Sequence, residues 1–228
     1  MIGVYDSGSG GLTALTHLLR LAPSADICYR GDLSNAPYGT KSANELVPII
    51  EQNTARLLSL GAAHILLACV TASSLYSYLS PKAKSHLYPI TFALADAAAR
   101  KTKTGKIGII STTRTMREGV LSRLLCEREF STVQSTADPL VQLAERHMTD
   151  PAHPEVRQAV KAACLLHKRA EVDTLILGCT HFPLFSLAFA EEMGRDVTLI
   201  DSGYEGALAF LNQIPKRVLL GQGQIHFI

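Results

Sequence analysis

Several features that would quickly narrow the class of this protein are missing from its sequence. No stretch approaches the roughly 20 apolar residues of a membrane-spanning helix. The charged residues nearly balance, at a formal net charge of +2, and the densest basic run, residues 100–106, holds only four cations. Such a run is typical of a solvated helix end. We therefore expect neither a membrane span nor a nucleic-acid partner.

The cysteines lack a pairing pattern. They are widely spaced, odd in number and contain no C-x-x-C pair: Cys28, Cys69, Cys126, Cys164 and Cys179. This argues against a disulfide framework and against a zinc site. The chain also enters an apolar strand at Ile2, without the basic and apolar segments of a secretory signal. We expect free thiols, no metal and a cytoplasmic protein.

The composition favours an ordered α/β protein. With 228 residues, 47% of them hydrophobic and 18% charged, the chain can bury a full core as one large or two small domains. Apolar strand-like runs alternate with helical segments, which indicates α/β layers with mainly parallel sheets. Ligands of such sheets bind at the carboxyl ends of the strands, so the residues that follow strands are the first candidates for a site.

The run LILGCTHFP, residues 175–183, is the strongest local signal of function. Its first three residues read as a buried strand, and Gly178 lets the backbone turn. Cys179 then falls at the strand's carboxyl end, ahead of Pro183, a residue favoured in the first turn of a helix. Because a helix N-terminus lowers the pKa of a nearby thiol, this placement predicts a reactive cysteine.

The same construction occurs earlier in the chain. Residues 65–73 read ILLACVTAS, and Cys69 follows its apolar run as Cys179 follows its own, at an offset of 179 − 69 = 110. IGVYDS at residues 2–7 and IGIIST at residues 107–112 repeat at nearly the same offset, 107 − 2 = 105. We therefore predict two related halves, each offering one cysteine to a shared cleft.

A glycine-rich turn, residues 6–11, follows the first predicted strand. Its backbone N–H groups, with the start of a helix at about residues 12–21, could hold an anionic ligand. The turn fits neither GxGxxG nor GxxxxGK[ST], so a nucleotide site is not supported. An ordinary tight turn is the alternative interpretation.

Capping and proline patterns predict the other helices. Ser42 and Glu45 form a capping box, and Pro48 predicts a kink or a false start in the helix that follows. Thr71 or Ser73 can cap a helix toward residue 79. Further strands are predicted at residues 26–29, 88–92, 107–110 and 197–200, and further helices at residues 114–125, 139–148, 154–168 and 204–211.

The three cysteines outside the two matched runs have a plainer interpretation. Cys28, Cys126 and Cys164 fall on predicted strand or helix faces. There a free cysteine usually behaves as a small buried hydrophobe. For Cys69 and Cys179 the matched placement favours function, and a redox pair is the weaker option because no resolving-cysteine motif lies nearby.

Two opposed thiols suit proton transfer at carbon. An unperturbed cysteine, with a pKa of about 8.5, is only a few per cent thiolate at neutral pH, so its surroundings must activate it. A thiolate on one face of a substrate can remove a Cα proton while a thiol on the other face returns one. This inverts a stereocentre without a cofactor.

Five motifs resemble the cofactor-independent Asp/Glu racemase superfamily, and within it the glutamate racemases. They are IGVYDSGSGGLT (residues 2–13), PYGTKS (37–42), CVTAS (69–73), LILGCTHFPL (175–184) and IDSG (200–203), in the family's order. The resemblance implies two pseudo-symmetric α/β domains with the active site in the cleft between them. Residues 1–92 with about 205–228 would form the first domain, and residues 93–204 the second.

The resemblance also implies roles for individual residues. Cys69 and Cys179 would be the two acid/base groups, with Asp6 assisting the first and His181 the second. Asp6, Ser7, Tyr38, Gly39, Thr71, Thr180 and His181 would hold the amino acid. Glu145 would accompany His181. The family's activity, L- to D-glutamate for peptidoglycan, requires no metal and no pyridoxal phosphate, and a homodimer is left open.

One position departs from the family's pattern. The first cysteine motif of the family is Cys-Asn-Thr, and here it is Cys69-Val70-Thr71. Valine can neither donate nor accept a hydrogen bond, and a bond to a charged group contributes roughly 1.5–3 kcal/mol. Two alternatives therefore stay open: an aspartate or broad-specificity racemase, and a catalytically impaired protein of this fold that binds or regulates.

Overall fold

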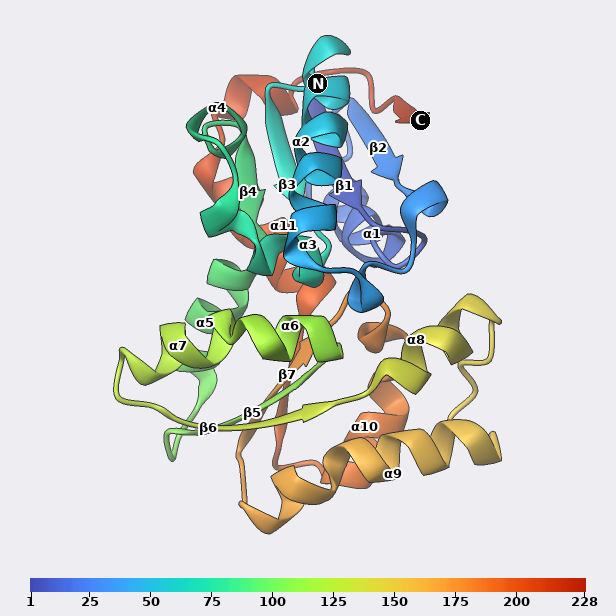
Figure 1. Cartoon of the computed structure of the whole chain (residues 1–228), viewed down its shortest axis with the longest axis vertical. Coiled ribbons are helices and arrows are strands. Elements are labelled where there is room, and N and C mark those ends of the chain that lie inside the picture. Colours follow the sequence, from blue (N-terminus) through green and yellow to red (C-terminus); the bar gives the residue numbers. More distant parts are fainter.

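The computed structural model describes residues 1–228, which form two lobes, each built on its own parallel sheet (Figure 1). Sheet A has the strand order β4-β3-β1-β2-β9, and sheet B has the order β6-β5-β7-β8. The strands of sheet A are β1 (Ile2–Asp6), β2 (Ile27–Gly31), β3 (His64–Leu67), β4 (Leu87–Pro89) and β9 (Ile225–Phe227). Those of sheet B are β5 (Lys106–Ser111), β6 (Ser131–Thr136), β7 (Thr174–Gly178) and β8 (Thr198–Asp201).

The two sheets repeat one topology. If β1, β2, β3 and β4 are matched in chain order to β5, β6, β7 and β8, the order β4-β3-β1-β2 becomes β8-β7-β5-β6, which is the order found in sheet B. In both sheets the strand that precedes a matched cysteine, β3 or β7, pairs in parallel with the first strand of its half. The predicted α/β fold with two pseudo-symmetric parallel sheets is confirmed.

Helices cover the sheets in both lobes (Figure 1). In the lobe of sheet A these are α1 (Leu12–Leu21), α2 (Ala43–Ser59), α3 (Val70–Ser74), α4 (Pro81–Lys84) and α11 (Ser202–Gln213). With sheet B lie α5 (Ile90–Lys101), α6 (Thr113–Glu118), α7 (Val120–Cys126), α8 (Asp138–Glu145), α9 (Pro154–Arg169) and α10 (Ser186–Met193). Short 3-10 turns occur at Leu33–Asn35, Tyr38–Thr40, Tyr76–Tyr78, Phe182–Phe185 and Lys216–Leu219.

Four hydrophobic clusters form the core. One lies on each face of sheet A, and a third unites β7 with α8, α9 and α10. The fourth packs β5, β7 and β8 against α5 and α7, and it also contains Val70 from α3. Helices α5 and α11 are in contact, as are α3 and α5. The lobes therefore share apolar contacts on the α5 side of the cleft.

Several predicted element boundaries are wrong for identifiable reasons. The single helix predicted at 114–125 is two helices, because Gly119 adopts φ 63°, a left-handed conformation that ends α6. The predicted strand 88–92 ends at Pro89, and α5 begins at Ile90. Strand β6 was missed altogether, since its sequence STVQST is polar and half-buried and has no apolar run.

The capping predictions were partly correct. Ser42 and Glu45 do form a capping box, and α2 continues without interruption through Pro48, so the predicted false start is wrong. Neither Thr71 nor Ser73 caps the helix after β3: the Cys69 side chain does, and α3 ends at Ser74. None of the helices combines the length and the apolar content that a membrane span requires.

The C-terminal strand β9 pairs in parallel with β2, so both chain ends lie in the lobe of sheet A (Figure 1). The division of the chain into residues 1–92 with about 205–228, and 93–204, remains a prediction. Helix α5 crosses the first of these boundaries, since it begins at Ile90 and packs largely in the cluster of sheet B.

Candidate active site

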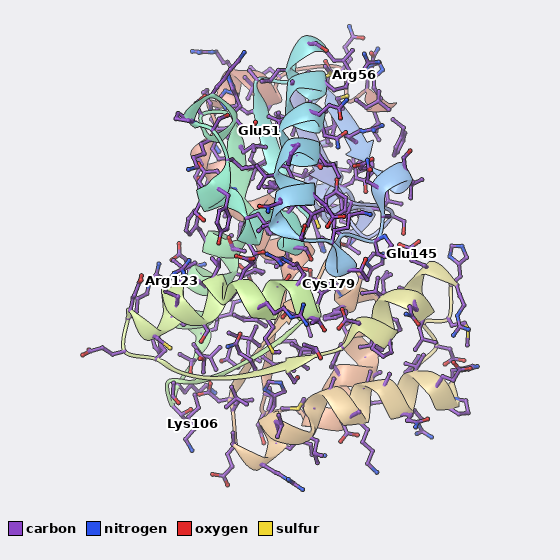
Figure 2. The ribbon with its side chains drawn as sticks, viewed as in Figure 1. Glu51, Arg56, Lys106, Arg123, Glu145 and Cys179 are labelled. Carbon is purple, nitrogen blue, oxygen red and sulfur yellow. The ribbon has the colours of Figure 1, made fainter.

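The carboxyl ends of the strands of the two sheets border one cavity of about 390 Å³. This volume lies within the range of small-molecule sites. Its lining includes eight of the nine predicted site residues: Ser7, Tyr38, Gly39, Cys69, Thr71, Cys179, Thr180 and His181. The ninth, Asp6, is completely buried beneath the lining. Figure 2 shows Cys179 where the two lobes meet.

Cys179 faces the cavity directly after β7, beside an imidazole. Its Sγ lies 3.7 Å from His181 Nδ1, and His181 Nε2 lies 2.6 Å from Glu145 Oε1. Glu145 stands at the end of α8 and also accepts a hydrogen bond from Ser9, 3.1 Å away in the other lobe. This row of cysteine, histidine and carboxylate orients the imidazole for proton exchange with the thiol.

Cys69 lies in a different environment, at the start of α3. Its Sγ lies 3.4 Å from Ser7 Oγ and accepts from the Ala72 backbone N–H at 3.5 Å. The expected helix N-terminus is therefore present here. At Cys179 it is absent, because a 3-10 turn, Phe182–Phe185, separates β7 from α10. There the His181 backbone N–H is the group that acts to lower the pKa of the thiol.

Asp6 connects the halves from beneath the cavity. Its carboxylate accepts hydrogen bonds from the Gly8 backbone N–H at 2.9 Å and from Thr180 Oγ1 at 3.1 Å. Close packing accompanies these bonds, since a Cβ on Gly10 would lie 2.5 Å from Thr180 Oγ1 and 2.8 Å from the His181 ring. Only glycine fits there, so the glycine-rich turn packs closely against the other lobe.

Burial dominates the electrostatics of the site. It raises the pKa of the Cys69 thiol to about 12, and the nearby Asp6 carboxylate adds to the effect. Burial likewise raises the pKa of the Cys179 thiol above its ordinary value, and that of the Asp6 carboxyl, which His181 and hydrogen bonds oppose. The expected lowering of the thiol pKa is therefore wrong, because desolvation exceeds the contribution of the N–H donors.

Tyr38 is held by a buried network that the sequence did not reveal. Its hydroxyl donates to Asp32 at 2.6 Å and lies 2.5 Å from the Tyr5 hydroxyl. The Asn53 amide bonds both Asp32 and Tyr5, at 3.0 and 3.2 Å. The network fixes the 3-10 turn Tyr38–Thr40, which carries the Gly39 backbone to the cavity. Asp32 directly follows β2, and Asp6 is the last residue of β1, so both carboxylates lie at the carboxyl ends of neighbouring strands, a signal that could have identified Asp32.

The predicted site also lacks four polar residues of the lining: Thr40, Thr112, Asp138 and Gln142. Thr112 directly follows β5, at the position equivalent to Ser7 after β1 in the aligned repeats IGIIST and IGVYDS. Asp138 accepts from the Thr113 hydroxyl at 2.6 Å and from its N–H at 3.1 Å. The lining contains no lysine or arginine. A substrate carboxylate there would depend on backbone N–H and hydroxyl donors.

The match of the chain to known families agrees with this geometry. Residues 20–209 fit the model of the Asp/Glu/Hydantoin racemase family. The chain belongs to this family. It is an isomerase of the racemase type, and the predicted relationship is confirmed.

Individual relatives give the same result. The glutamate racemase of Lactococcus lactis subsp. lactis is 36% identical over 207 residues, which cover 90% of this chain and 75% of the relative. The glutamate racemase isoform RacE1 of Bacillus anthracis superposes with a TM-score of 0.88 at 32% identity, over 100% of this chain and 86% of that one. The Francisella tularensis glutamate racemase, solved in complex with D-glutamate, gives a TM-score of 0.89 at 25% identity, over 99% and 86% of the two chains.

Proposed function

We propose that this protein interconverts L- and D-glutamate by two-thiol proton transfer at Cα. The observation that carries the proposal is that Cys69 and Cys179 border one cavity from different lobes, each after the equivalent strand of its sheet. The similarity to glutamate racemases supports glutamate as the substrate. The D-glutamate complex of the Francisella tularensis relative supports an amino acid in this cavity.

In the proposed reaction, one cysteine thiolate takes the Cα proton and becomes a thiol. The other cysteine, a thiol at the start, gives its proton to the opposite face of the carbanion and becomes a thiolate. The substrate keeps its composition and is inverted. The enzyme ends with its proton on the other sulfur, so the free enzyme must exchange protons before the next turnover in the same direction.

The surroundings of each thiol suggest how it loses its proton despite burial. His181, held by Glu145, lies close enough to exchange a proton with Cys179. On the other side, the Asp6 carboxylate raises the pKa of the Cys69 thiol, and the Ser7 hydroxyl and the Ala72 backbone N–H oppose it and favour the thiolate. A bound α-ammonium group would further favour a thiolate in the cavity. Ser7, Tyr38, Gly39, Thr71 and Thr180 would hold the substrate by hydrogen bonds. Tyr38 and Thr71 would do so through their backbone groups, because other buried side chains engage their hydroxyls.

We propose that the product serves peptidoglycan, as in the family, and that neither metal nor pyridoxal phosphate takes part. A homodimer and a cytoplasmic location remain predictions. Val70 supports a second candidate function, in which the protein binds an amino acid and does not turn it over. An aspartate or broad-specificity racemase is the nearest alternative within the enzyme class.

Deuterium incorporation at Cα, followed by proton NMR in D₂O, tests the proposal with L- and D-glutamate and both aspartate enantiomers. We expect exchange with both glutamate enantiomers and formation of the opposite enantiomer. Faster exchange with aspartate would reassign the substrate. Thermal stabilisation by glutamate without any exchange would refute turnover and favour the binding protein.

A further inference from the structure

Two consecutive residues of the first cysteine motif belong to different cores. Cys69 is part of the cluster on one face of sheet A, with Tyr38 and Leu67 among its members. Val70, only 1% exposed, is part of the cluster of sheet B, with β5, β7, β8, α5 and α7. The peptide link between Cys69 and Val70 therefore passes from one lobe's core to the other's.

The next residue also contacts the second lobe. The Thr71 hydroxyl lies 3.1 Å from that of Thr112 and 3.2 Å from that of Thr115, and these two lie 3.0 Å apart. All three side chains are buried. Three hydroxyls in a triangle can each donate to one neighbour and accept from the other. Each of these buried hydroxyls therefore has hydrogen-bond partners at the boundary between the lobes.

We propose that Val70 is a positioning residue that ties the location of the Cys69 thiol to the docking of the two lobes. Val70 also borders the cavity, so an asparagine at this position would place its amide between the cavity and an apolar cluster, whereas valine packs in that cluster. Valine thus replaces a polar side chain beside the cavity by apolar packing between the lobes. Thr71 reinforces the same docking by hydrogen bonds. This inference rests on the proposed function for its kinetic test but not for its chemical one.

The consequence concerns Cys69 more than Cys179. Cys69 caps α3, a helix of five residues whose first two side chains, Val70 and Thr71, contact the second lobe. Cys179 follows β7, a central strand of sheet B that pairs with β5 on one side and β8 on the other, so its position is fixed by the sheet more than by the Val70 contact. Loosening Val70 should therefore displace one of the two acid/base groups and leave the other in place.

The kinetic test compares Val70→Ala with Leu125→Ala, a truncation in the same cluster but distant in sequence from either motif. We expect kcat/KM of Val70→Ala to fall by roughly 10- to 100-fold, the order of loss that a displacement of about 1 Å causes. The effect of Cα deuteration should rise only for the enantiomer that Cys69 deprotonates. The other enantiomer should show a larger solvent isotope effect instead. Leu125→Ala should change both enantiomers alike.

The chemical test needs no turnover. Iodoacetamide alkylation of the wild-type and variant proteins, quantified for the Cys69 and Cys179 peptides by mass spectrometry, should show a several-fold higher ratio of Cys69 to Cys179 labelling in Val70→Ala only. An unchanged ratio, or the same change in Leu125→Ala, would overturn the inference. So would higher activity in Val70→Asn, since that would make the position a substrate contact. Absence of Cα exchange in the wild type would refute the proposed function and leave the labelling test valid.

Discussion

The two halves of the molecule have the same strand order but surround their cysteines differently. Cys179 has an imidazole at 3.7 Å backed by the Glu145 carboxylate, whereas Cys69 has a serine hydroxyl at 3.4 Å and a backbone N–H. Only Cys179 has a titratable side chain, that of His181, as a hydrogen-bond partner of its sulfur. The repeated topology therefore accounts for where the thiols lie, and the local side chains account for how each would be activated.

The comparison predicts that neither thiol can replace the other. Cys69→Ser and Cys179→Ser should each lower racemisation by about 10²- to 10⁴-fold, the range for a general acid or base, because serine is a far weaker acid than cysteine. Each variant should retain exchange mainly from one enantiomer, and the favoured enantiomer should differ between the two. NMR exchange in D₂O measures this. Equal residual exchange from both enantiomers in each variant would contradict opposed thiols.

Removing the neighbours of the thiols should reveal the asymmetry. His181→Asn removes a proton acceptor and should lower kcat by about 10²-fold. Ser7→Ala, the matched change at Cys69, removes a neutral hydrogen bond that contributes about 1 kcal/mol, so a loss of less than about 10-fold is expected. Steady-state kinetics in both directions compares them. Similar losses in the two variants would show that His181 does not serve Cys179 as a base.

Glu145 should matter less than His181, since it acts through the imidazole. Glu145→Gln keeps a hydrogen-bond acceptor for His181 Nε2 but removes the negative charge, and the Glu145 side chain is 44% exposed. We expect kcat to fall by about 10-fold, at the low end for a bond between charged groups. The double variant with His181→Asn should be no slower than His181→Asn alone. Additive losses would mean that Glu145 acts independently, for instance through Ser9.

Substitution of His167, in α9 of the second half, should have the smallest effect on activity. Its effect should appear instead in the pH dependence of folding stability, for which the first half has no matched histidine in this comparison. His167 is completely buried, and its Nε2 lies 2.8 Å from Ser135 Oγ, whose proton goes to the Ala163 carbonyl; Nδ1 has no partner. His167 Nε2 is thus the protonated nitrogen of the neutral ring. Burial lowers the pKa of His167 to about 4.

The sign of the pH dependence follows from that lowered value. At pH values above about 6.5, the pKa of the unfolded state, the imidazole is neutral in both the folded and the unfolded protein. As the pH falls from 6.5 toward 4, only the unfolded protein binds the proton, so the free energy of unfolding decreases. The loss should reach about 3 kcal/mol, at about 1.4 kcal/mol for each unit of pKa. Urea denaturation at pH 7 and pH 4.5 should show a smaller acid loss for His167→Gln than for the wild type. Equal losses would assign the acid sensitivity to other groups.

Much of the fold and of the candidate site could be predicted from the sequence because the strands have a clear apolar pattern. The runs before Cys69 and Cys179 are apolar and end abruptly, so the strands and their carboxyl ends were located correctly. The motif order then indicated the family, and eight predicted residues line the cavity. Glu145, expected to accompany His181, does contact it.

What the sequence concealed depends on three-dimensional contacts. Strand β6 is polar because it is only half-buried, and Cys126, expected to be buried, is exposed at the end of α7. The Asp32 network joins the residue after β2 to residues of β1, a 3-10 turn and α2 that no local pattern connects. The thiol pKa was expected to fall because the N–H donors are visible in the sequence, whereas the depth of burial is not.

The fit of Gly10 against Thr180 and His181 has a thermodynamic consequence. The cavity walls, the hydrogen bond from Thr180 to the Asp6 carboxylate and the packing at Gly10 all exist only while the lobes are docked. A ligand that binds between them must therefore stabilise the docked arrangement, and through it both sheets, by an amount that grows with its concentration. Because the site exists only where the two lobes meet, the occupancy of the cavity and the folding stability of the whole chain are linked.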